Sequence, residues 1–90
     1  MNWTISISRE AEKFLTRNRI QQNKISALMQ LALKKFAGGV ANIDIKKLKG
    51  AWRGFHRIRR GDLRIIASFN FDTAAIFVEI IDWRGNAYKE

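Results

Sequence analysis

Two spacings of hydrophobic residues divide the chain into helical and extended regions. Residues 3–7 alternate between apolar and polar side chains, which is typical of a strand. Ser8 then fits a helix N-cap, because Glu10 and Glu12 follow in the first turn, where the helix dipole favours negative charge. Apolar residues next recur at helical spacing over two helices, which are separated by the polar residues 17–19 and end at Gly38-Gly39. The apolar faces comprise Ala11, Phe14 and Leu15 in the first helix and Ile25, Leu28, Met29, Ala32 and Phe36 in the second, which starts near Gln21.

The second half of the chain alternates at every second residue and predicts three further strands. They span about 54–60, 63–71 and 75–84, and residues 43–50 form a connection or a short extended piece before them. The order β-α-α-β-β-β predicts an α+β fold, in which two N-terminal helices pack on a small, mainly antiparallel sheet. A length of 90 residues without Pro or Cys predicts a single domain, 1–90.

A Gly-Asp pair at positions 61–62 separates two alternating runs, which is a signal for a tight β-hairpin. In that hairpin Arg59 lies opposite Arg64, and Arg57 shares their face of the sheet. Like charges that face each other across strands destabilise a sheet, so the fold gains from this arrangement only when an anion lies between them. A polyphosphate chain is the predicted anion. His56 falls on the opposite face and is expected to be structural.

The sequence leaves the register of the last strand open. A two-residue turn at positions 72–73 would place Arg84 on the face opposite Arg64, whereas a three-residue loop at positions 72–74 would place both on the same face. Glu79 interrupts the apolar run of this strand, which allows a β-bulge there.

The charge of the chain adds a functional prediction to the fold. The formal net charge is +9, with a pI near 10.7. Eight of the nineteen residues from 46 to 64 are Lys or Arg, so the charge is concentrated in one segment. Such an excess points to nucleic acid or to an acidic partner protein.

The residue types that the chain lacks argue against other classes of protein. Without Cys there is no disulfide or thiolate metal site, and a single His argues against a His-based metal site, so no metal or cofactor is expected. No apolar run reaches the roughly 18 residues of a membrane span. The N-terminus also lacks the apolar stretch of a signal peptide. We therefore expect a cytoplasmic protein that does not associate with membranes.

Two segments, RIRRGDLRII and IIDWRGNAYK, together with this order of elements, resemble the RelE/ParE toxin superfamily of bacterial and archaeal toxin–antitoxin systems. The resemblance covers nearly the whole chain and includes SREAEKFL and DIKKLKG. The RelE branch of this superfamily cleaves mRNA in the ribosomal A site, whereas the ParE branch poisons DNA gyrase. Some positions that hold Lys in RelE hold Arg here. The catalytic set that the resemblance implies is Arg57, Arg59, Arg64, Arg84 and Tyr88.

The resemblance implies a metal-independent endoribonuclease that cleaves mRNA on the ribosome and is bound by a cognate acidic antitoxin. Tyr88 would take the proton of the 2′-hydroxyl, and the arginines would stabilise charge on the phosphate. Further contacts to RNA are expected from the central segment, through Lys46, Lys47, Lys49, Trp52, Arg53 and Arg60. Two alternatives remain open: a ParE-like inhibitor that binds gyrase without catalysis, and an RNA-binding module without chemistry.

Overall fold

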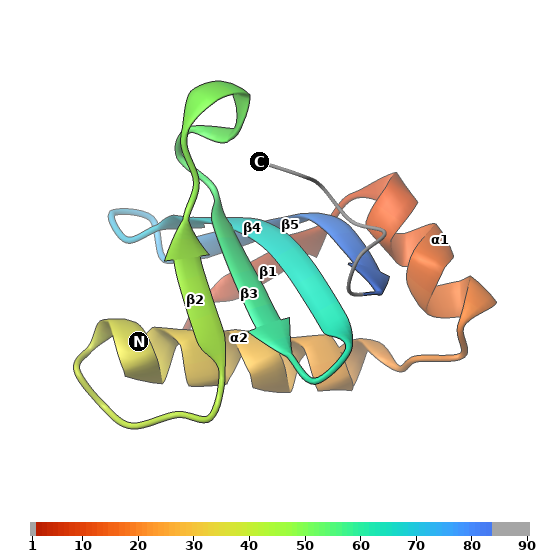
Figure 1. Ribbon diagram of the computed structural model, residues 1–90, viewed down its shortest axis with the longest axis horizontal. Coiled ribbons are helices and arrows are strands. Elements are labelled where there is room, and N and C mark those ends of the chain that lie inside the picture. The colour runs from red at the N-terminus through yellow and green to blue at the C-terminus, as the bar shows by residue number, and fades with distance from the viewer. Residues whose placement is uncertain (1, 84–90) are drawn as a thin grey trace.

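The structure, a computed structural model, describes residues 2–83 as two α-helices, five strands and one turn of 3₁₀ helix (Figure 1). The predicted order is confirmed, and the open question over residues 43–50 is answered by a short strand followed by the start of the 3₁₀ turn. The elements are β1 (Thr4–Ile7), α1 (Arg9–Arg17), α2 (Gln22–Phe36), β2 (Asp44–Lys47), η1 (Gly50–Trp52), β3 (His56–Arg60), β4 (Leu63–Asn70) and β5 (Ala75–Trp83).

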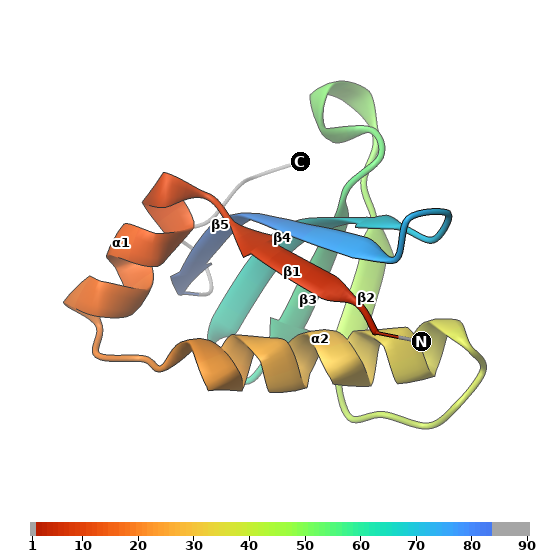
Figure 2. The ribbon, with the colours of Figure 1, turned by 180° about the vertical axis from the view of Figure 1, so that it is seen from behind.

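The five strands form one sheet in the order β1-β5-β4-β3-β2. Only β1 pairs in parallel, with β5, and the three other pairs are antiparallel, so the predicted mainly antiparallel α+β fold is confirmed. Helix α2 runs across β2 and β3 (Figure 1), and the view from behind shows the same crossing (Figure 2). Neither α1 nor α2 has the length and apolar character that crossing a bilayer requires.

One hydrophobic core joins both helices to a single face of the sheet, which we call the helix face. The predicted apolar positions of α1 and α2 are buried, apart from Phe36, which is partly exposed at the end of α2. On the sheet side, the core takes alternate residues of the strands because side chains on a strand point to alternate faces. The core residues that β3, β4 and β5 contribute are Ile58, Leu63, Ile65, Ala67, Ile76, Val78 and Ile81.

Ser8 fixes the start of α1 and ties it to the sheet. As predicted, it is the N-cap: its Oγ accepts a hydrogen bond from the Ala11 backbone N–H at 3.1 Å. The same hydroxyl donates to the backbone oxygen of Glu79 at 2.6 Å. Because Glu79 belongs to β5, one side chain sets both the first turn of α1 and its place against the sheet.

A β-bulge resolves the register of β5. Next to the loop, Asn70 pairs with Ala75, which is the register of a two-residue turn at positions 72–73. The ladder then shifts by one residue between Ile66 and Ala67, so that Glu79 is the extra residue, as its position in the sequence suggested. Beyond the bulge the strand follows the register of the three-residue loop. Arg84 and Tyr88 lie outside the described residues.

Candidate functional site

The hairpin between β3 and β4 brings the predicted basic residues together. Gly61 has φ +59, a left-handed conformation that suits glycine, and this allows the tight turn. Arg59 pairs with Arg64 across the two strands, as the sequence predicted. Arg57 and Arg59 are two residues apart on β3 and therefore share a face with Arg64. We call this surface, opposite the helix face, the arginine face.

Asp44 supplies the negative charge between two of these arginines. Its Oδ2 accepts a hydrogen bond from Arg57 Nη2 at 2.9 Å and lies 3.1 Å from Arg59 Nη2. The side chains of Arg57 and Arg59 are only 14% and 31% exposed, against 48% for Asp44. The expectation that only a bound anion could balance this face was therefore wrong for Arg57 and Arg59, because the chain provides a carboxylate of its own.

Arg64 occupies the centre of the arginine face. It lies between Arg59 on one neighbouring strand and Asp82 on the other, in direct register with both. Its Nε is buried and has no hydrogen-bond partner among residues 2–83. Asp82 Oδ1 accepts a hydrogen bond from the backbone N–H of Trp83 at 2.7 Å. Since a buried donor without a partner costs free energy, an anion that reached Arg64 would relieve that cost.

The predicted RNA-binding residues fall into separate groups. Lys46 is exposed and pairs directly with Arg57, so it extends the arginine face onto β2. Lys47, Lys49 and Arg53 line a cavity of about 330 Å³ around the loop between β2 and β3. Trp52 packs edge-to-face on Phe55 with ring centres 5.3 Å apart, so at least one side of its ring is used within the protein.

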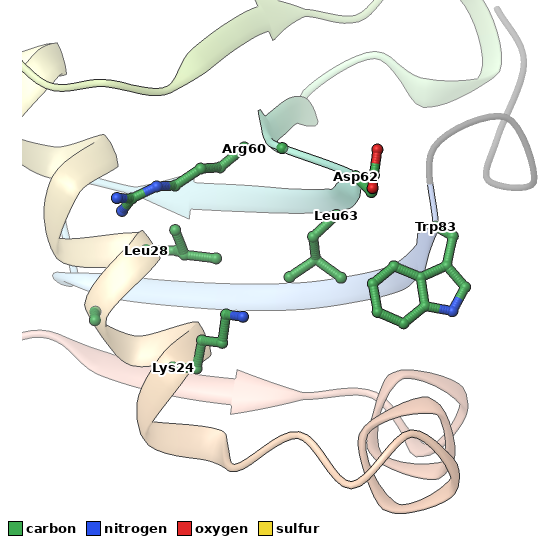
Figure 3. A pocket seen from close by; sticks show the side chains of 8 residues that line it. Lys24, Leu28, Arg60, Asp62, Leu63 and Trp83 are labelled. Atoms are coloured by element: carbon green, nitrogen blue, oxygen red, sulfur yellow. The ribbon is translucent and has the colours of Figure 1, made fainter.

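Arg60 lies apart from the other predicted RNA-binding residues. Strand alternation puts it on the helix face, where it lines a cavity of about 530 Å³ beside the hairpin turn (Figure 3). Leu28 and Leu63 contribute apolar walls to this cavity, and Lys24 and Trp83 lie at its other sides. Arg60 therefore lies on the face of the sheet opposite Arg57 and Arg59, although it also lines a second cavity together with Arg59 at the hairpin.

His56 also lies on the helix face, as predicted. Its ring contacts Phe36 and Phe69, with ring centres 5.1 and 5.9 Å away. Burial lowers the pKa of His56, and the positive charge of Lys47, its pairing partner on β2, lowers this pKa further. The imidazole is therefore neutral at pH 7 and is held away from the arginine face.

The lowered pKa of His56 predicts a pH-dependent stability. As the pH falls below the unfolded-state pKa of 6.5, the unfolded chain takes up a proton that the folded protein resists. The free energy of unfolding should thus decrease between about pH 7.5 and about pH 5.5, and His56→Phe should remove part of that decrease. Urea unfolding midpoints of both proteins at the two pH values test this. An identical pH dependence in the variant would contradict it.

The arginine face is suited to holding a phosphodiester. Guanidinium groups bind phosphate oxygens through two parallel hydrogen bonds, and three of them lie on neighbouring strands here, with Lys46 at the edge. Fixed positive charge of this kind also stabilises the extra charge that develops on phosphorus in a transition state. Within residues 2–83, the ionisable groups on this face are cations and carboxylates, so a phenol such as Tyr88 would have to come from the last seven residues.

Three solved structures are similar to this chain over nearly its whole length. YafQ from E. coli matches with a TM-score of 0.68 and 16% identity, covering 98% of this chain and 100% of the other. The archaeal RelE–RelB complex from Pyrococcus horikoshii OT3 matches with a TM-score of 0.60 and 25% identity, over 97% and 100%. The toxin–antitoxin complex RelBE2 from Mycobacterium tuberculosis gives 0.60 and 17%, over 93% and 100%.

Comparisons based on sequence give no match for this chain. No protein-family model matches the chain, and no curated protein is significantly similar to it. The similarity is therefore one of fold, and it extends over 100% of each of the three solved chains. This chain has the fold of the RelE-like toxins of toxin–antitoxin systems.

Proposed function

We propose that this protein is the toxin of a toxin–antitoxin system and a metal-independent endoribonuclease that cleaves mRNA on the ribosome. The observation that carries the proposal is the convergence of Arg57, Arg59 and Arg64 on one face of a RelE-like fold. Three arginines on neighbouring strands support phosphate binding, because guanidinium groups match the geometry of phosphate oxygens. The reaction centre would be the scissile phosphate, held on the arginine face.

In the proposed reaction the 2′-oxygen of RNA attacks the neighbouring phosphorus and the 5′-oxygen leaves, giving a 2′,3′-cyclic phosphate. Tyr88 would accept the proton of the 2′-hydroxyl, and the surrounding positive charge would favour its phenolate form. Arg64 and Arg84 would stabilise the charge on the phosphate and on the leaving oxygen. We assign them electrostatic roles because a guanidinium group holds its proton too tightly to be a good proton donor.

The proposed partner that silences the toxin is an acidic, amphipathic antitoxin segment. Charge complementarity supports this, since the chain carries a net charge of +9. The cavity beside the hairpin turn would suit such a segment, because its apolar walls at Leu28 and Leu63 are flanked by Lys24 and Arg60. The complexes of RelE with RelB and of DinJ with YafQ are solved for proteins with the same fold.

Primer extension on an mRNA translated by purified ribosomes tests the proposal against the gyrase alternative. We expect new RNA 5′ ends inside codons after the protein is added, because the ribosome presents codons in a fixed conformation. DNA supercoiling by purified gyrase should be unaffected by the same amount of protein. Intact mRNA together with blocked supercoiling would favour the ParE-like function instead. Intact mRNA with normal supercoiling and tight RNA binding would favour a binding module.

A further inference from the structure

Asp44 occupies the position on the arginine face that a phosphate oxygen would take. A single oxygen, Oδ2, receives Nη2 of both Arg57 and Arg59, at 2.9 and 3.1 Å. Two guanidinium groups that converge on one anionic oxygen form the arrangement that binds a phosphate. We propose that Asp44 is an internal substitute for the RNA phosphate, which positions Arg57 and Arg59 and is displaced from at least one of them when RNA binds. This inference rests on the proposed function.

The exposure of the Asp44, Arg57 and Arg59 side chains indicates which of them a competing anion can displace. The two arginines are mostly covered, whereas Asp44 is about half exposed. Asp44 is also the first residue of β2, an edge strand of the sheet, whereas Arg57 and Arg59 lie on β3, which has a neighbouring strand on each side. A competing anion would therefore displace the carboxylate outward and leave the guanidinium groups in place.

A path for that anion lies beside the ion pair. A cavity of about 410 Å³ is lined by Asn42, Ile43, Asp44, Arg59, Arg60 and Gly61. Its wall thus contains both the carboxylate and one of the two guanidinium groups that it binds. A phosphate that enters this cavity would contact Arg59 and lie close to the carboxylate of Asp44. Electrostatic repulsion between the two anions would then drive Asp44 away.

The exchange has two opposite effects on RNA binding. While Asp44 is present, Asp44, Arg57 and Arg59 together carry a net charge of +1, so they attract RNA less strongly than the two arginines would without the carboxylate charge. The same ion pairs also hold the two arginines in place in the absence of RNA, which reduces the conformational entropy that is lost when RNA binds. Removing the carboxylate charge should therefore tighten binding, which is the opposite of what loss of a purely structural residue does.

Binding of a short, uncleavable 2′-O-methyl RNA to Asp44→Asn tests this directly. We expect binding about 5- to 10-fold tighter than wild type at low salt, because no carboxylate charge then competes with the RNA phosphate for the two guanidinium groups. The slope of the logarithm of the association constant against the logarithm of the salt concentration should become more negative by about 0.7. This is the value for one additional charge neutralised on a single strand. The matched control is Asp72→Asn, which removes the same charge from the exposed loop at the far end of β4. It should leave the salt slope unchanged.

Two further measurements separate the outcomes. The affinity gain should disappear when Arg59→Gln is added to Asp44→Asn, because the gain requires that guanidinium group. In the wild-type protein, the NMR signal of the Asp44 carboxyl carbon should shift when the RNA is added, while that of Asp72 stays. This readout holds even if the variant is poorly folded. Absence of this shift, or equal affinity and slope in Asp44→Asn and Asp72→Asn, overturns the inference. If wild type binds RNA no better than Arg64→Ala, the proposed function fails as well.

Discussion

Purified protein should cleave mRNA in translating ribosomes at least about 1,000-fold faster than the same RNA free in solution. The described part of the arginine face offers guanidinium groups together with the carboxylates of Asp44 and Asp82. The guanidinium groups bind a phosphate strongly but do not by themselves align the 2′-oxygen, phosphorus and leaving oxygen in one line. An external scaffold must impose that geometry, and correct positioning can lower a barrier by roughly 7–11 kcal/mol. The proposed scaffold is the ribosome, on which the Lys47, Lys49 and Arg53 cavity would contact ribosomal RNA.

Single-turnover rates with an end-labelled mRNA, bound to ribosomes or free, measure this ratio. Contacts to RNA phosphates release counterions, so binding to the ribosome should weaken as the salt concentration rises. At protein concentrations below saturation, the cleavage rate on ribosomes should therefore fall steeply with added salt. The Arg64→Ala variant, purified in the same way and added at equal concentration, shows how much of the cleavage comes from contaminating ribonuclease. Similar rates on the two substrates would indicate a self-sufficient ribonuclease and would remove the ribosome from the mechanism.

Arg64→Ala should reduce cleavage on ribosomes by about 100- to 1,000-fold, the range seen when one preorganised charge-stabilising donor is removed. Arg64 lies at the centre of the arginine face and its Nε has no partner within residues 2–83, so its loss should affect chemistry more than stability. Arg64→Lys keeps the charge but loses the two-pronged geometry, and should recover only part of the activity. Single-turnover cleavage and growth arrest on expression both report the effect.

The charge-matched control is Arg9→Ala, which removes an exposed cation at the start of α1. Its activity should be close to wild type, and thermal unfolding should show that both variants are folded. We expect Tyr88→Phe to be as inactive as Arg64→Ala, because the phenol oxygen is the proposed base. Full toxicity of Arg64→Ala and Tyr88→Phe at wild-type protein level would mean that the reaction centre lies elsewhere.

Local signals were sufficient to predict most of this fold. The Ser8 cap and the Gly-Asp turn are each specified by two or three neighbouring residues, and both are confirmed. The pairing of β1 with β5 joins strands about seventy residues apart, and no local pattern encodes which edge β1 takes. The bulge at Glu79 was visible only as a break in an apolar run, because its position depends on how β4 and β5 align.

The candidate site was predicted less completely, for a related reason. Alternation on β3 and β4 placed Arg57, Arg59 and Arg64 on one face, because a two-residue turn leaves no freedom in the register. The ion pairs of Asp44 do not follow from the sequence, which predicts a connection or a short extended piece at residues 43–50. Only the pairing of β2 with β3 brings Asp44 to Arg59. A lone acidic residue two positions before a lysine pair was the available signal. The assignments to Arg84 and Tyr88 stay predictions.

The extra residue in β5 determines which residue lies opposite Arg64. An uninterrupted ladder that continued the pairing of Asn70 with Ala75 would place Ile81 there instead of Asp82. Deleting the codon for Glu79 would remove the bulge but leave Ile80 paired with Ile66 and Asp82 paired with Arg64. One deletion can thus straighten β5 without changing the residue that pairs with Arg64. The cost would fall on the Ser8 anchor, whose acceptor is the Glu79 carbonyl. Lineages with this sheet can therefore lose the extra residue and keep the surroundings of the arginines, provided that another carbonyl replaces that of Glu79 as the acceptor for Ser8.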